Sequence, residues 1–93
     1  TEGAWLGNLG LAYADLVDAR KAIDYYERRL AIAREIGDRR GEGNALFNMS
    51  LALNSLGKQM EAKEMATEAL AIFELIESPN AELVRQTLAA WQK

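Results

Sequence analysis

The chain has 93 residues, of which 49% are hydrophobic and 27% charged, a balance typical of a folded globular domain and not of a disordered segment. Its net charge of −3 disfavours nucleic acid or an anionic membrane as the main partner, and no apolar run reaches the ~20 residues of a membrane span. Cysteine is absent, which excludes disulfides and thiolate metal sites and allows a reducing compartment, so we expect a cytoplasmic protein.

The chain repeats itself at a displacement of 40 positions, the difference between Gly3 and Gly43. The matched pairs are Glu2 with Glu42, Leu6 with Leu46, Asn8 with Asn48, Leu11 with Leu51, Ala12 with Ala52, Leu16 with Leu56, Ala22 with Ala62, Leu30-Ala31-Ile32 with Leu70-Ala71-Ile72, and Ile36 with Ile76. A single displacement that holds over so many positions indicates two copies of one structural unit.

Each unit is predicted to contain two helices joined by a tight turn. Apolar residues spaced three and four apart give each helix one side that faces the core. In the first helices these residues are Leu6, Leu9, Tyr13 and Leu16, and then Leu46, Met49, Leu53 and Leu56. In the second helices they are Ala22, Ile23, Tyr26, Leu30 and Ala33, and then Ala62, Ala66, Ala69, Leu70 and Phe73.

Several residues indicate where these helices begin and end. Gly37 and Gly57 can adopt the left-handed backbone conformation that ends a helix, and Asp18 can cap the helix that follows it. Val17 is the counterpart of Gly57 in the first unit and disfavours a positive φ, so we expect a distorted turn there.

A last helix is predicted after Ser78-Pro79, because serine suits the cap and proline the first turn. Val84, Leu88 and Trp91 fall on one side of it, and it departs from the repeat, as the closing helix of a solenoid does. We therefore predict an all-α, antiparallel helix-pair solenoid in a single domain. Its parts are repeat one over 1–40, repeat two over 41–78 and a capping helix over 79–93.

The order of large and small residues in both units resembles the tetratricopeptide repeat. The resemblance is carried by Leu6, Leu9-Gly10, Tyr13, Ala22, Tyr26, Leu46, Met49-Ser50, Leu53, Ala62 and Ala69. The unit is longer than the ~34 residues of the ordinary repeat, and residues 25–38 resemble the long repeats of kinesin light chains and of Leu-Gly-Asn-repeat spindle-orientation adaptors. Two positions depart from the pattern: Arg29 replaces a small residue, and Ala66 replaces an aromatic one, which should thin the packing of the second repeat.

The resemblance implies a protein that binds peptide segments of a protein partner along a concave groove lined by the first helix of each pair. In chaperone-clamp members of the family, Lys and Asn in this groove hold a C-terminal carboxylate. The matching positions here are Gly7, Leu11, Phe47 and Leu51, so the resemblance implies no carboxylate clamp.

The first helices carry no charged residue over 3–14 and 43–57, whereas the second helices are rich in charge. A helix face that met only water would normally carry charged residues, so we expect these faces to be partly covered. Our hypothesis is a neutral peptide-binding groove lined by Asn8, Leu11, Asn44, Phe47, Asn48, Leu51 and Asn54. The alternative is that neighbouring helices of the solenoid already cover these faces.

The N-terminal end of the predicted solenoid is expected to be open. Trp5, Leu9 and Ala12 would face a preceding repeat that this chain lacks, and two repeats are fewer than the three or so that a solenoid usually needs. We therefore expect the isolated chain to form a homo-oligomer. A structural or oligomerisation element is accordingly the alternative to a peptide-binding module.

Catalysis has little support in the sequence. Histidine and cysteine are both absent, which removes the commonest general base, nucleophile and transition-metal ligands. Asp15, Asp18 and Asp24 lack the spacing of a calcium loop, and the glycines of residues 37–43 lack the strand and the Lys-Ser or Lys-Thr of a phosphate loop. We predict no catalytic residue, metal or cofactor.

A basic group is the remaining candidate for binding nucleic acid or an acidic peptide. It consists of Arg28, Arg29, Arg34, Arg39 and Arg40, interleaved with Glu27, Glu35, Asp38 and Glu42. Pairs such as Glu35 with Arg39 are spaced for ion pairing along a helix or for a solvated helix end, so we interpret the group as a solvated face and expect no nucleic-acid partner.

Overall fold

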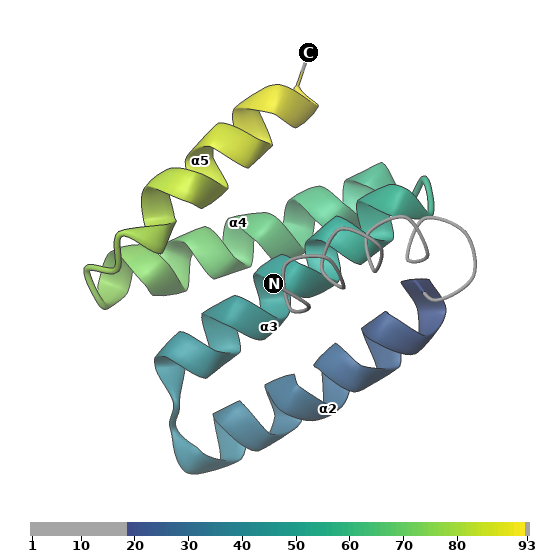
Figure 1. The fold of residues 1–93 in the computed structure, drawn as a ribbon. Coiled ribbons are helices and arrows are strands. Elements are labelled where there is room, and N and C mark those ends of the chain that lie inside the picture. The colour runs from purple at the N-terminus through teal and green to yellow at the C-terminus, as the bar shows by residue number, and fades with distance from the viewer. Residues whose placement is uncertain (1–18, 93) are drawn as a thin grey trace, which may run out of the picture.

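The computed structural model describes residues 19–92, which form four α-helices with short connections (Figure 1). Helix α2 spans Ala19–Ile36, α3 spans Arg39–Ser55, α4 spans Gln59–Leu75 and α5 spans Asn80–Trp91. Each helix packs mainly on the next one in the chain, so that α3 lies between α2 and α4, and α5 lies on α4 (Figure 1). Residues 19–92 contain no strand, which confirms the predicted all-α architecture of packed helix pairs.

A residue in the left-handed conformation ends each of α2, α3 and α4. These residues are Gly37 (φ 75°), Gly57 (φ 80°) and Glu77 (φ 56°). The N–H of the following residue donates to a carbonyl five residues earlier, from Asp38 to Ala33 at 2.8 Å, Lys58 to Leu53 at 3.0 Å and Ser78 to Phe73 at 2.8 Å. These bonds satisfy carbonyls that a helix end leaves free. The predicted roles of Gly37 and Gly57 are confirmed, whereas the positive φ of Glu77 is a new finding.

Side-chain oxygens cap the starts of α3 and α5. The Asp38 carboxylate accepts a hydrogen bond from the Gly41 N–H at 3.0 Å, and the Ser78 hydroxyl accepts one from the Asn80 N–H at 3.1 Å. Helix α5 begins at Asn80, directly after the predicted start at Ser78-Pro79. Helix α3 begins at Arg39, two residues ahead of the expected start of the second repeat at 41. Val17 and Asp18 lie outside the described residues.

The core forms where α3 meets α2 and α4. Its buried members from the predicted core-facing sides are Leu30 and Ala33 of α2, Leu46, Met49 and Leu53 of α3, and Ala62, Ala66, Ala69 and Phe73 of α4. Phe73 is fully buried and packs on the backbone of Gly43, where a Cβ would lie 2.7 Å from a ring carbon. The absence of a side chain at Gly43 therefore sets how closely α3 approaches α4.

Helix α5 closes the described part of the chain with one apolar side. Val84 is buried, and Leu88 and Trp91 are half-buried against the core, as the sequence predicted. None of the helices within residues 19–92 combines the length and the apolar character needed to cross a bilayer.

Candidate protein-binding site

The predicted groove residues of the second repeat lie on one side of α3. Asn44, Phe47, Asn48, Leu51 and Asn54 are spaced three and four apart, which places them along one helical face. Asn44 and Asn48 are exposed, and Phe47, Leu51 and Asn54 are half-buried. Opposite its core-facing side, α3 thus carries a face that is uncharged and partly open.

Asn44 and Asn48 line a pocket of about 310 Å³ between α3 and α2. The other residues around it are Tyr25, Tyr26 and Arg29 of α2 and Gly41 and Ala45 of α3. The two tyrosine rings meet edge to face with centroids 5.6 Å apart, and the Arg29 guanidinium lies 5.9 Å from the Tyr25 ring centroid. The sequence prediction did not include this aromatic and cationic wall, although an aromatic residue at position 25 on the charged side of α2 was a usable signal.

The remaining groove residues do not line this pocket. On a helical projection, Phe47 and Asn54 fall nearest to Gly43, which contacts α4, so they lie towards α4 and not towards α2. Phe47 also packs against the core. The structure thus separates an amide pair near α2, Asn44 and Asn48, from Phe47 and Asn54 on the side towards α4. Asn8 and Leu11 of the predicted groove, and the predicted self-association residues Trp5, Leu9 and Ala12, lie outside the described residues.

The chemistry of this face is that of an uncharged recognition surface. An Asn side chain offers two donor hydrogens and an acceptor oxygen, which can pair with the N–H and C=O of an extended peptide. Phe47 and Leu51 offer apolar area beside them. Within residues 19–92, no group of three or more Asp or Glu side chains is placed to hold a metal ion.

Charge is concentrated away from this face, in a network that joins three helices. Arg34 of α2 donates to Glu42 of α3 at 3.2 Å and to Glu68 of α4 at 2.9 Å. Glu42 is only 8% exposed and also accepts a hydrogen bond from Arg39 at 3.4 Å. The nearly buried carboxylate therefore has two cationic partners, as a buried charge requires.

A second network joins α4 to α5. Arg85 donates to Glu74 at 2.8 Å and to Glu82 at 3.0 Å. These two hydrogen bonds, the first of them foremost, raise the pKa of the Arg85 guanidinium above its ordinary value. The networks tie the four described helices together and leave the uncharged face of α3 free of ion pairs among the described residues.

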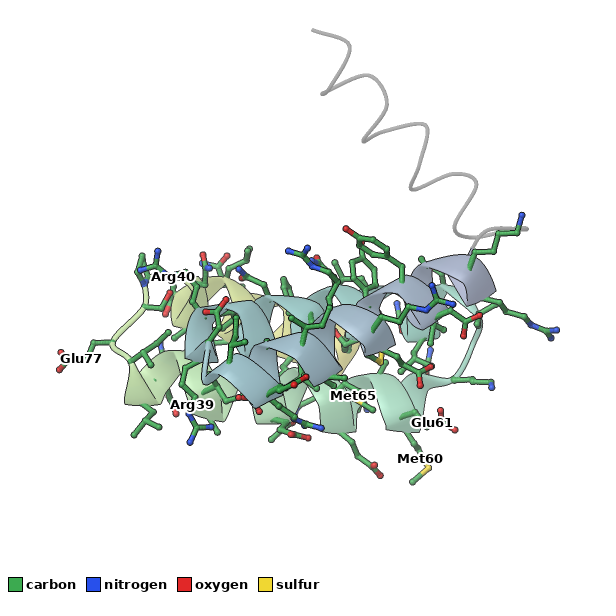
Figure 2. The ribbon with its side chains drawn as sticks, turned by 90° about the horizontal axis from the view of Figure 1, so that it is seen from below. Arg39, Arg40, Met60, Glu61, Met65 and Glu77 are labelled. Carbon is green, nitrogen blue, oxygen red and sulfur yellow. The ribbon has the colours of Figure 1, made fainter. Side chains whose placement is uncertain are left out.

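Glu35 and Arg39 form no ion pair within the described residues, and both side chains are exposed, as at a solvated helix end. A spacing of four aligns side chains only within one helix, and here Gly37 ends α2 before α3 begins. Arg39 pairs with Glu42 of its own helix instead. Figure 2 shows Arg39 and Arg40 diverging at the start of α3, and both are exposed, in keeping with a solvated basic group.

Residues 1–74 match the family model of the tetratricopeptide repeat. The human G-protein-signaling modulator 1 is 40% identical over 62 residues, which cover 67% of this chain and 9% of that protein. Regulatory protein AfsR of Streptomyces griseus is 35% identical over 71 residues, or 76% of this chain and 7% of that protein. The chain thus spans less than a tenth of either relative.

No solved structure matches the chain. Tetratricopeptide repeats are protein-interaction modules, typically non-enzymatic scaffolds, and the helix pairs seen here have that architecture. The match to the family model, which covers most of the chain, shows that the chain belongs to the tetratricopeptide repeat family.

Proposed function

We propose that this chain binds a peptide segment of another protein along the uncharged face of α3. The observation that carries the proposal is the combination of openness and neutrality on this face. No charged residue occurs over 43–57, although Asn44 and Asn48 are exposed and Phe47 and Leu51 are only half-buried. Because a face that met only water would normally carry charge, this pattern favours coverage by a partner.

The roles of the groove residues follow from their chemistry. Phe47 and Leu51 supply apolar contact, and the amides of Asn44, Asn48 and Asn54 bind the backbone of the peptide. In the same proposal, Asn8 and Leu11 extend the groove into the first repeat. The partner segment is a neutral, apolar one, since α3 itself carries no charged residue over 43–57.

A peptide-display selection against the chain tests this proposal. The double variant Phe47→Ser and Leu51→Ser should weaken binding of the selected peptides by roughly 2 kcal/mol, which is about a 30-fold rise in Kd, as loss of an interface hot spot does. The matched control is Met60→Ser and Leu75→Ser, which removes strongly exposed apolar side chains from α4 (Figure 2 labels Met60). Unchanged affinity in the first variant, or an equal loss in both, would reject the groove.

A structural role is our second proposal, because the repeated unit occurs twice in this sequence and a solenoid usually needs about three copies. In this case Trp5, Leu9 and Ala12 pack on another copy of the chain. Light scattering should then give a mass above that of the 10.3 kDa monomer at high protein concentration. A monomeric mass at every concentration would exclude the proposal.

A further inference from the structure

Helix α4 carries exposed apolar residues on its outer side, opposite its core-facing side. Met60 and Leu75, near the two ends of the helix, are 78% and 68% exposed. Thr67 and Ala71 lie between them and are exposed as well. These four residues are seven, four and four positions apart, so they form one stripe along the helix, about 22 Å long at 1.5 Å per residue. Figure 2 shows Met60 projecting away from the other helices.

The middle of this outer stripe of α4 is narrow and needs no polar partner. The Thr67 hydroxyl donates to the Lys63 carbonyl of its own helix at 2.7 Å, so its donor hydrogen is satisfied internally. Ala71 has only a methyl group. Small side chains between two large ones allow another helix to lie closely along the stripe, with Met60 and Leu75 as its end contacts.

The charge beside the outer stripe is mainly acidic. Glu61, Glu64 and Glu68 are exposed on α4, whereas Lys63, on the opposite flank, is half-buried. Glu68 is paired with Arg34 of α2. Glu61 and Glu64 form no ion pair within residues 19–92, so their charges are available to a binding partner.

The internal repeat supplies a reference for this side of α4. At the displacement of 40 residues it corresponds to a side of α2 that is exposed too, but the residues there are of mixed charge. Arg20, Lys21, Asp24, Glu27, Arg28 and Glu35 of α2 stand in the places of Met60, Glu61, Glu64, Thr67, Glu68 and Leu75. Mixed charge is the ordinary state of a solvated helix side. The apolar and acidic character is therefore a property of α4 and not of its place in the repeat.

We propose that the outer stripe of α4 binds an amphipathic helix of another protein, with an apolar side flanked by lysine or arginine. Met60 and Leu75 supply the apolar contacts, and Glu61 and Glu64 pair with the basic flank of the partner. A symmetric pairing of two copies through this stripe would set their glutamates against one another, which like charge disfavours. The same charge disfavours nucleic acid and anionic membranes.

This inference is independent of the proposed groove, because no residue of the outer stripe belongs to the uncharged face of α3. The two double variants therefore exchange roles. Met60→Ser with Leu75→Ser, the control for the groove, is the variant under test here, and Phe47→Ser with Leu51→Ser is the control.

Fluorescence anisotropy of a synthetic helix tests the inference. The probe is a labelled, acetylated peptide of about 18 residues, long enough to span the stripe, with leucine and alanine on one side and lysine on the other. It should bind saturably, and Met60→Ser with Leu75→Ser should raise its Kd at least about tenfold. Phe47→Ser with Leu51→Ser should leave the Kd unchanged. A second peptide with glutamate in place of lysine should not bind.

Matched charge variants test the acidic flank. Glu61→Gln with Glu64→Gln should raise the Kd of the lysine peptide about threefold at low salt, and less at high salt because the pairing is screened. The control Glu27→Gln with Glu35→Gln removes the same number of charges from exposed positions of α2 and should change the Kd little.

A dye placed on the stripe locates the bound peptide, because the chain has no cysteine of its own. A solvent-sensitive dye on Ala71→Cys should shift its emission to the blue when the lysine peptide binds. The same dye on Ala31→Cys, the exposed counterpart on α2, should not respond. Far-UV circular dichroism checks that every variant keeps its helices.

Several results would overturn the inference. An absence of saturable binding, or an equal loss in the stripe and groove variants, would remove the site from α4. Equal effects of the two charge variants, or equal binding of the glutamate peptide, would remove the charge complementarity. A response of the dye at position 31 equal to that at 71 would place the peptide elsewhere. A mass above that of the monomer that Met60→Ser with Leu75→Ser abolishes would assign the stripe to a second copy of the chain.

Discussion

The turn between α4 and α5 places Glu77 at φ 56°, a position where the two earlier turns have glycine. Gly37 and Gly57 close the same pattern of backbone hydrogen bonds at φ 75° and 80°. The left-handed conformation costs a residue with a Cβ about 1–2 kcal/mol, and glycine adopts it freely. We therefore expect Glu77→Gly to stabilise the fold.

The size of this gain is the difference between two terms. Relief of the left-handed strain raises the free energy of unfolding by about 1–2 kcal/mol. The greater conformational freedom of glycine in the unfolded chain lowers it by about 0.4–1 kcal/mol. Glu77 is exposed and forms no ion pair within residues 19–92, so loss of its side chain adds no further term. Taken at the middle of both ranges, the net gain is about 0.8 kcal/mol, which for a domain of this size raises the Tm by about 3–6 °C.

Thermal unfolding followed by far-UV circular dichroism measures this shift. Glu77→Ala is the matched control: it removes the same charge but keeps the Cβ, so it should not raise the Tm. Gly57→Ala, which introduces a Cβ at φ 80°, should lower it. A Tm that rises equally for Glu77→Ala and Glu77→Gly would show that the charge matters and not the backbone, and would refute the reasoning.

Three further changes test the contacts between and within the helices. Asp38→Ala should lower the free energy of unfolding, measured in urea, by about 1 kcal/mol, because it removes the side-chain cap of α3. The control Asp24→Ala, at an exposed position inside α2, should change this free energy little. An equal loss in both variants would show that the cap is not the cause. Gly43→Ala should also destabilise the fold. The added methyl group overpacks against Phe73 at a cost of about 1–3 kcal/mol, whereas the gain in helix propensity is only about 1 kcal/mol. A variant more stable than the original chain would show that the Phe73 ring can move aside. Glu42→Gln should lower the free energy of unfolding by about 1–2 kcal/mol at low salt and by less at high salt, because the charge-assisted hydrogen bonds to its two arginine partners weaken. A loss of stability that does not depend on salt would show that these charge-assisted bonds are not its cause.

The sequence alone determined the repeat, the class of fold and the core-facing side of each described helix. These features depend on properties that each residue has wherever it lies. Apolar side chains at spacings of three and four fix a helix face, and a glycine such as Gly57 tolerates a positive φ. The uncharged face of α3 was visible in the sequence for the same reason, since it is defined by residue types along one helix.

Only the tertiary structure decided which helices share a contact and how close they come. Arg34 reaches Glu68 across 34 positions, and Asn48 shares a pocket with Tyr25, because packing brings their helices together. Glu77 takes a positive φ without being glycine, because the packing of α5 on α4 and the hydrogen bonds of the turn hold it there. Local preferences thus determine the elements, whereas contacts between elements depend on their relative placement, which short-range patterns do not encode.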